Sequence, residues 1–314
     1  MSGELKVLLG VSEGLGNGVL FTPVISQLAD DNPGMQIDVL SSDRAYDVMA
    51  KHPRINRIYR ETEQITDHYN YSLNSCFRTA RFDEPLKRVS DKLLYEPEQQ
   101  RKFLFTSEIE INLQTLMSEK LIKSINQKFY PTLFPVPDIY EKQKMILMHV
   151  GCHSNKHWEK KKWPDNYWLD LISYFKKEMS EYKLCLLCGE HEKEQTNQMA
   201  NESDVPVFKD TLDKVAALMM ASSLLISIDS GIMHLGTTTG IKQIAMFGPT
   251  SEIKNKPHVQ DNRAIILRKE INCQRCYISD KANRTNMFIT CRDNICMKML
   301  SPGYVFETAR EMLK

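Results

Sequence analysis

The feature that most constrains this chain is a strand–turn–helix unit in its last third. Residues 223–228 form an apolar run typical of a buried parallel strand, and the run leads directly into Asp229, Ser230 and Gly231. Asp and Ser commonly cap helix N-termini, and Gly240 is suited to end the helix that follows. Because the first amides of a helix have no partner within it, the turn predicts a phosphate site with a carboxylate beside it.

The same alternation of strand and helix recurs along the chain and predicts an α/β protein. Strand-like runs at residues 6–11 and 36–40 flank a helical segment at residues 19–28, and a second series starts at residues 145–150. Short connections of this kind produce parallel sheets with helices on both faces. We therefore expect two doubly wound domains.

The boundary between the two domains is predicted in residues 129–143, which contain three prolines and little helical period. An N-terminal domain of residues 1–140 and a C-terminal domain of residues 141–314 follow from this. A chain of 314 residues is long enough to give each half its own core.

Charge and hydropathy disfavour several classes of protein. The 41 Lys and Arg residues are balanced by 40 Asp and Glu, which gives no support to a generally basic nucleic-acid binder. No apolar stretch reaches the length of a membrane span, and the first residues run into a strand without a signal-peptide pattern. We expect a cytoplasmic protein without an integral membrane segment, with peripheral attachment to the inner membrane as the alternative.

Five short motifs occur along nearly the whole chain in one characteristic order. They are Gly16-Asn17 with Thr22-Pro23, Lys162-Trp163-Pro164, Asp229-Ser230-Gly231 with Met233-His234-Leu235, Phe247-Gly248-Pro249-Thr250, and Cys296-Met297 with Ser301-Pro302. In this order the chain resembles glycosyltransferase family 9, the ADP-heptose:lipopolysaccharide heptosyltransferases and their relatives. The resemblance implies a GT-B fold, in which two Rossmann-like domains face each other across a cleft.

The resemblance also implies the activity. The expected reaction is inverting transfer of a sugar, with heptose as the first expectation, from a nucleotide-diphosphate sugar such as ADP-heptose to a hydroxyl of the lipopolysaccharide core. The N-terminal domain would hold the acceptor and the C-terminal domain the donor, with the last helix packing back on the N-terminal domain as an option. Two alternatives stay open: the same donor chemistry on a protein or modified DNA base, and a non-catalytic sugar-nucleotide-binding module.

The expected donor-binding residues lie in both halves: Gly16, Gly18, Lys162, Asp229, Ser230, Gly231 and His234. By resemblance, Asp229 holds sugar hydroxyls and Lys162 reaches the phosphates. His234 is either a buried structural histidine or a phosphate ligand. The alternative register, in which Lys156-His157-Trp158 matches the lysine motif, is disfavoured because Pro164 follows the later Lys-Trp pair.

The N-terminal loop departs from the family pattern at Asn17. Heptosyltransferases commonly carry an Asp there, thought to act as the general base, and a carboxamide cannot accept the proton of the acceptor. Either Asn17 positions substrate, or another carboxylate is the base. Glu13, on the same loop, is the nearest candidate, although a solvated loop acid is an equal interpretation; Asp43 and Asp67 are further candidates.

Four cysteines near the C-terminus have metal-ligand spacing. Cys273 and Cys276 form a CxxC pair, and Cys291 and Cys296 follow after a loop. Four thiolates favour a closed structural site, and zinc and iron both stay open because some protein-heptosylating relatives hold iron with cysteines at a similar place. The alternative is four reduced cysteines on an irregular loop. No catalytic metal is expected.

Overall fold

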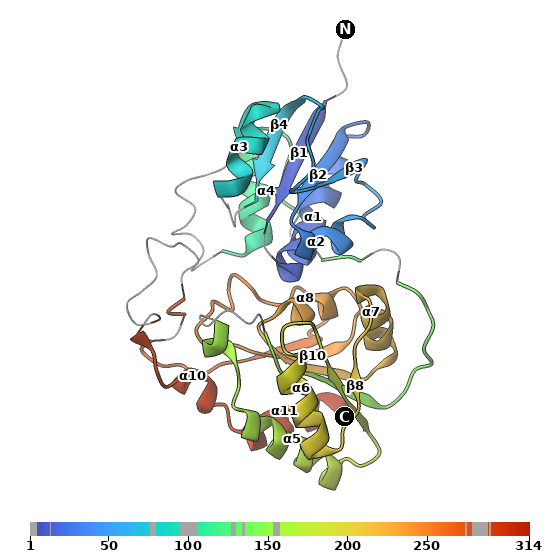
Figure 1. Ribbon diagram of the computed structural model, residues 1–314, viewed down its shortest axis with the longest axis vertical. Coiled ribbons are helices and arrows are strands. Elements are labelled where there is room, and N and C mark those ends of the chain that lie inside the picture. The colour runs from blue at the N-terminus through green and yellow to red at the C-terminus, as the bar shows by residue number, and fades with distance from the viewer. Residues whose placement is uncertain are drawn as a thin grey trace. The chain divides into compact units, whose positions relative to one another are not determined.

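The computed structural model describes residues 5–12, 14–75, 80–94, 106–126, 130–133, 136–152, 158–273, 275–277, 288 and 290–314. Within the chain, residues 1–135 and 136–314 form two separate compact units, whereas the sequence placed the boundary at residue 140. The elements of each unit are labelled in Figure 1.

The first unit contains a five-stranded parallel sheet in the order β3-β2-β1-β4-β5. Its strands are β1 (Lys6–Val11), β2 (Gln36–Ser41), β3 (Arg57–Arg60), β4 (Tyr69–Asn74) and β5 (Ser90–Leu94). Its helices are α1 (Leu15–Asp31), α2 (Asp43–Met49), α3 (Ala80–Arg88) and α4 (Glu108–Ser118). Strand β1 is therefore the middle strand of this sheet.

Helix α1 begins four residues before the predicted helical segment, so Gly16 and Gly18 are helical residues and not loop residues. A Cβ atom at Gly18 would lie 3.1 Å from the Cβ of Ala45 on α2. Gly18 thus permits the close packing of α1 on α2. The packing of α1 on α2 therefore accounts for Gly18, which the sequence assigned to donor binding.

The second unit contains a six-stranded parallel sheet in the order β11-β10-β9-β6-β7-β8. Its strands are β6 (Met145–His149), β7 (Lys183–Leu187), β8 (Val207–Phe208), β9 (Leu224–Ile228), β10 (Lys242–Met246) and β11 (Ala264–Leu267). Its helices are the 3-10 turn η2 (Trp158–Lys161), α5 (Asp165–Glu178), α6 (Lys193–Ser203), α7 (Leu212–Ala221), α8 (Gly231–Thr237), α10 (Ile295–Lys298) and α11 (Pro302–Leu313).

Aromatic side chains fasten the last helix to the core of the second unit. Phe306 of α11 packs edge-on against Phe175 of α5, with ring centroids 5.2 Å apart. Trp163 and Trp168 are both fully buried, and the indole N–H of Trp163 donates to the carbonyl of Leu300 at 2.8 Å. This bond satisfies the buried indole N–H of Trp163 and ties the segment that leads into α11 to the core.

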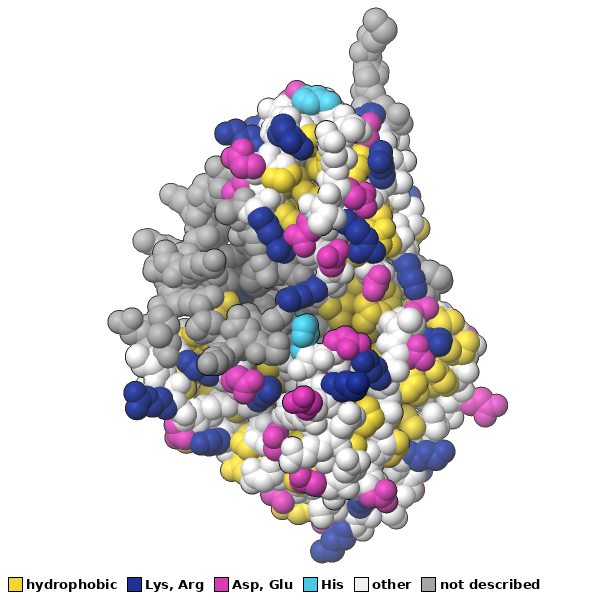
Figure 2. Space-filling view, in the orientation of Figure 1, with side chains coloured by type: hydrophobic (Ala, Val, Ile, Leu, Met, Phe, Trp, Pro, Cys, Tyr) yellow, Lys and Arg dark blue, Asp and Glu magenta, His cyan; other side chains and the backbone are white. Residues whose placement is uncertain are grey.

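All strands in each sheet run in one direction, so their carboxyl ends meet at one edge, which is where ligands bind in open α/β sheets. In the second unit this edge brings together the residues after β6, β9 and β10. Among the described residues no helix combines the length and apolar character needed to cross a bilayer. On the face shown in Figure 2, acidic and basic side chains intermingle and form no broad area of one sign.

Candidate functional site

An ion pair lies at the carboxyl end of the central strand β9. Asp229 follows β9, and the ammonium of Lys161 lies 3.0 Å from its Oδ2 atom, with side chains 13% (Lys161) and 5% (Asp229) exposed. Burial alone would raise the pKa of Asp229, but the Lys161 charge holds it below its ordinary value. Asp229 is therefore an anion at the sheet edge.

Lys162, the lysine predicted from the sequence, points elsewhere. Its ammonium lies 3.0 Å from Oε1 of Glu159, while its carbonyl accepts a hydrogen bond from Asn294. Consecutive residues of a 3-10 helix project about 120° apart. Two consecutive lysines at the end of η2 therefore have different partners: Lys161 faces Asp229, and Lys162 faces Glu159 at the surface.

Ser230 caps helix α8, as its place after the strand predicted. Its Oγ atom accepts a hydrogen bond from the amide of Met233 at 3.4 Å. The amide of Asp229 bonds to the carbonyl of Met246, whereas Gly231 and Ile232 open the helix and are only half-buried. The first amides of α8 lack partners inside the helix, as at any helix start.

A buried histidine and glutamate lie beneath Ser230, and sequence reasoning missed both. His149 ends β6; its Nε2 atom lies 2.8 Å from Oε1 of Glu192, and its Nδ1 atom lies 3.2 Å from the Ser230 hydroxyl. Burial alone would raise the pKa of Glu192, but His149 and the Gly189 amide hold it below its ordinary value. No local pattern marks this pair, because its members are brought together by the sheet.

His234 is a buried neutral histidine. Burial lowers its pKa to about 4, against the effect of Asp229, whose Oδ1 atom lies 4.0 Å from Nε2. Its Nδ1 atom has no hydrogen-bond partner among the described residues. At neutral pH His234 can offer a ligand an N–H group but no charge.

In the first unit, both polar atoms of the Asn17 side-chain amide make hydrogen bonds. Its Oδ1 atom accepts from the backbone amide of Gly14 at 3.2 Å, and its Nδ2 atom donates to Oε1 of Glu108 at 2.9 Å. Glu108 is the first residue of α4 and is 1% exposed. A carboxylate from α4 thus stands beside the position where the family pattern has one on α1.

The other acid candidates have different environments. Asp43 pairs with Arg60 at 2.9 Å, and Asp67 accepts a hydrogen bond from the Tyr59 hydroxyl at 2.7 Å. Glu13 lies outside the described residues. Glu108 was not among the candidates because nothing in the local sequence of α4 links it to the loop.

Two of the four cysteines, Cys276 and Cys296, feel the charge of the others. Burial raises the pKa of Cys276 to about 11 and of Cys296 to about 12, and negative charge on the neighbouring cysteines adds to both effects. However, no group of three or more His, Cys, Asp or Glu within the described ranges is placed to hold a metal ion. Metal binding therefore stays a prediction.

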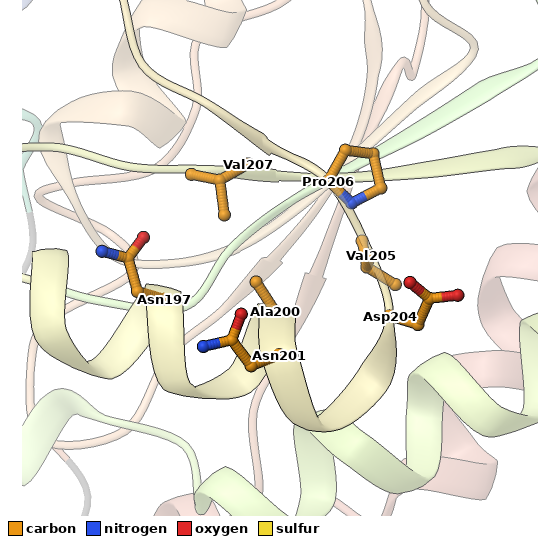
Figure 3. Close-up of a pocket in the computed structure, with 7 residues that line it drawn as sticks. All are labelled: Asn197, Ala200, Asn201, Asp204, Val205, Pro206 and Val207. Atoms are coloured by element: carbon orange, nitrogen blue, oxygen red, sulfur yellow. The ribbon is translucent and has the colours of Figure 1, made fainter.

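A surface depression near the C-terminal end of α6 lies apart from these residues (Figure 3). It is lined by Asn197, Ala200, Asn201, Asp204, Val205, Pro206 and Val207. With one ionisable side chain and no cation, it offers little for a charged ligand.

Known proteins share this fold and part of this sequence. A glycosyltransferase family 9 protein of Veillonella parvula superposes with a TM-score of 0.78 at 16% identity, covering 100% of this chain and 98% of the other. The iron-containing heptosyltransferase TibC of enterotoxigenic E. coli, solved with ADP-D-beta-D-heptose, gives a TM-score of 0.66 at 12% identity, covering 98% and 76%. These likenesses, with the two parallel sheets, confirm the predicted GT-B class of α/β fold.

Sequence similarity then places the chain in a family. Lipooligosaccharide heptosyltransferase 2 of Campylobacter jejuni is 29% identical over 163 residues, which are 49% of this chain and 47% of that protein, so the match spans about half of the relative. The family model described as glycosyltransferase family 9 (heptosyltransferase) matches residues 87–285, and the chain belongs to this family.

Proposed function

We propose that the protein transfers a sugar from a nucleotide-diphosphate donor to a hydroxyl acceptor, with heptose from ADP-heptose as the expected donor group. The observation that carries the proposal is the Lys161–Asp229 pair at the carboxyl end of β9, beside the start of α8. Membership of the family and the heptosyltransferase names of its relatives support the donor class.

Lys161, rather than Lys162, is proposed to reach the diphosphate. As the sugar leaves, negative charge grows on the phosphate oxygens, and preorganised cations and amides stabilise it. Lys161 supplies the cation. Ser230 and Gly231 begin the helix whose first amides can donate hydrogen bonds to an anion. Asp229 is proposed to accept hydrogen bonds from sugar hydroxyls once Lys161 turns to the phosphate.

Glu108 is proposed as the general base, with Asn17 as the residue that positions it. In the reaction, the acceptor oxygen bonds to the anomeric carbon, the bond from that carbon to the phosphate oxygen breaks, and the acceptor proton passes to a carboxylate. Attack opposite the leaving group inverts the anomeric centre. The 2.9 Å bond from Asn17 holds the Glu108 carboxylate beside the position where the family pattern has one, which supports this role.

The acceptor is proposed to be a lipopolysaccharide or lipooligosaccharide core sugar, as the names of the relatives suggest. Such an acceptor is anchored in a membrane, so the protein would act as a peripheral protein at that surface. A protein or a modified DNA base stays the alternative acceptor.

We also propose a structural metal on Cys273, Cys276, Cys291 and Cys296. The donor set is one that zinc or iron accepts, and mutual repulsion between the thiolates would be relieved by a cation. The similarity to the iron-containing heptosyltransferase TibC supports the idea. Such a metal would stabilise the loop, and no catalytic step depends on it.

The experiment that tests the function has two parts. Calorimetry with ADP-heptose, ADP and UDP should give binding to the adenine compounds, and a ligand at 100 times its Kd should stabilise the fold by about 2.7 kcal/mol. Incubation of ADP-heptose with heptose-free lipopolysaccharide should yield a heptosylated product of inverted anomeric configuration by NMR. Failure of both ADP compounds to bind would overturn the donor assignment, and binding without transfer to any acceptor class would leave the binding-module alternative.

A further inference from the structure

We propose that His149 and Glu192 are positioning residues for the leaving group, which take up one proton as the diphosphate binds and thereby turn the Ser230 hydroxyl toward it. This inference rests on the proposed function, because it places the diphosphate at Ser230. It assigns a role to a buried pair that the donor site described above does not use.

The three side chains form one continuous hydrogen-bonded chain. The Gly189 amide donates to Oε1 of Glu192 at 2.7 Å, the same oxygen lies 2.8 Å from His149 Nε2, and His149 Nδ1 lies 3.2 Å from Ser230 Oγ. The histidine and glutamate side chains are 4% and 6% exposed. A charged or polar chain of this kind is kept in a core only when each member is satisfied.

Two glycines make room for Glu192. A Cβ atom at Gly151 would stand 2.4 Å from the Cβ of Glu192, and one at Gly189 would stand 2.7 Å from its Oε1 atom. The backbone therefore closes on this carboxylate from two sides. Glu192 cannot swing away from His149 without moving one of these loops.

The direction of each hydrogen bond follows from the carboxylate. The ionised Glu192 can only accept, so Nε2 of His149 carries a hydrogen. In a neutral imidazole Nδ1 is then an acceptor, and the Ser230 hydroxyl donates to it. Ser230 meanwhile accepts from the Met233 amide, so its only hydrogen is directed inward, away from the helix start.

One added proton reverses the bond to Ser230. When a proton from solvent adds to Nδ1, the imidazolium keeps its bond to Glu192 and donates from Nδ1 to Ser230 Oγ. The hydroxyl oxygen then accepts from both His149 and Met233, and its hydrogen is released to donate to a phosphate oxygen. An arriving diphosphate anion favours this charged form, since opposite charges nearby stabilise it.

Other ionisable groups lie on, or directly after, β6 and the elements that adjoin it at this edge of the sheet. Cys188 follows β7, Asp229 follows β9 and pairs with Lys161 of η2, and His234 lies on α8. Cys152 follows β6 itself, and burial raises the pKa of its thiol to about 11. Glu192 is the acid that bonds directly to His149, and so we expect it to determine where the proton goes.

The test counts protons during binding. ADP-heptose is suitable because its diphosphate diester gains no proton near neutral pH. Calorimetry in buffers of different ionisation enthalpy should show about one proton taken up for each ADP-heptose bound. Affinity should fall about tenfold per pH unit as the pH rises through the range in which the complex holds this proton and the free protein does not.

Three variants separate this role from a structural one. His149→Gln and Glu192→Gln keep similar side-chain volumes and should abolish the proton uptake. Both variants should still bind ADP-heptose, but more weakly than wild type. His191→Gln removes an exposed histidine beside Glu192 and should keep the full uptake. Binding of ADP-heptose by wild type without proton uptake, or uptake retained in His149→Gln, overturns the proposal.

A measurement without ligand tests which nitrogen of His149 carries the hydrogen before the diphosphate binds. Nitrogen NMR of the histidine side chains should show His149 with its hydrogen on Nε2 and a bare Nδ1, a signal identified by its loss in His149→Gln. The opposite tautomer overturns the proposal even if no sugar nucleotide binds. Absence of binding with the expected tautomer would instead count against the proposed function.

Discussion

The Lys161 ammonium lies 3.0 Å from Asp229, while the ammonium of the next residue, Lys162, lies 3.0 Å from Glu159. Two adjacent lysines thus have separate surroundings: Lys161 is mostly buried against an acid at the sheet edge, and Lys162 pairs within its own surface turn. This contrast provides a matched pair for mutation.

Replacing Lys161 should impair the enzyme far more than replacing Lys162. We expect Lys161→Ala to lower kcat/KM with ADP-heptose by at least about 100-fold, because one preorganised charge on a leaving group is worth about 3–4 kcal/mol. Lys162→Ala should stay within about threefold of wild type, because exposed pairs contribute less than about 1 kcal/mol. Equal losses in both variants would contradict the assignment.

A stability control is needed for this comparison. Removing one partner of a buried ion pair costs about 3–5 kcal/mol because the other charge stays buried. Tryptophan fluorescence during denaturation is suitable, since all three tryptophans lie in the second unit. Lys161→Met combined with Asp229→Asn should recover stability but not activity, and recovery of both would show that the pair is merely structural.

Moving the carboxylate from Glu108 to position 17 should restore activity. Glu108→Gln should lower kcat by about 100-fold or more, since general bases typically contribute 10²–10⁴-fold. Asn17→Asp in the Glu108→Gln background should regain at least tenfold, because the two side chains are 2.9 Å apart. Full activity of Glu108→Gln in a rate assay over pH would remove Glu108 as the base and favour another acid such as Glu13.

Two glycine substitutions should have opposite effects on the second unit. Gly151→Ala forces a Cβ atom to 2.4 Å from Glu192 and should destabilise it by about 1–3 kcal/mol. Gly303 lies in α11 with no atom within 4 Å of the added Cβ, so Gly303→Ala should be neutral or stabilise by up to about 1 kcal/mol. Urea unfolding followed by tryptophan fluorescence measures both, and a stable Gly151→Ala variant would refute the tight fit around Glu192.

Stability should fall as the pH drops from 6.5 toward 4. Burial lowers the pKa of His234 to about 4, of His258 to about 3 and of His52 to about 4, from an ordinary 6.5. In this window the unfolded chain binds protons that the native state refuses, so each histidine removes roughly 1.4 kcal/mol per pH unit; above 6.5 the full stability is present. His258→Gln should flatten the pH profile of the urea midpoint by one such contribution, and an unchanged slope would contradict the burial effect.

The cysteine cluster should carry a metal in protein purified without chelator. Elemental analysis should find about one zinc or iron per chain, and removal by a chelator should lower Tm. Cys273→Ser with Cys276→Ser should lose the metal, whereas Cys188→Ser, at the end of β7, should keep it. Protein that contains no metal after growth in metal-replete medium would contradict the proposed metal site.

Local signals allowed the sequence to predict the strand, cap and helix start at one edge of the candidate site. Asp229, Ser230 and Gly231 combine a buried strand, a cap residue and a helix start within a few residues, and the structure has this order. The division into parallel α/β units followed in the same way from short-range alternation. Motif resemblance identified the family where spacing alone could not.

The partners of these residues were beyond local reasoning. Asn17 and Glu108 are 91 residues apart, and His149 is 81 residues from Ser230 and 43 from Glu192. Such contacts depend on strand order, which a single sequence does not encode in any short window. The sequence favoured Lys162, and it could not show that Lys161 pairs with Asp229, because which side chain faces that acid depends on the phase of one short 3-10 turn.

The strand order of the second sheet affects how the chain folds during synthesis. The described strands of the first sheet have all been made by residue 94, but β6 must wait for β9, which ends at Ile228, before its second edge is covered. An uncovered apolar strand edge invites association with other chains, and non-local parallel pairing is slow. The nascent second unit should therefore depend on chaperones, and slower translation or cooler growth should raise the yield of intact protein.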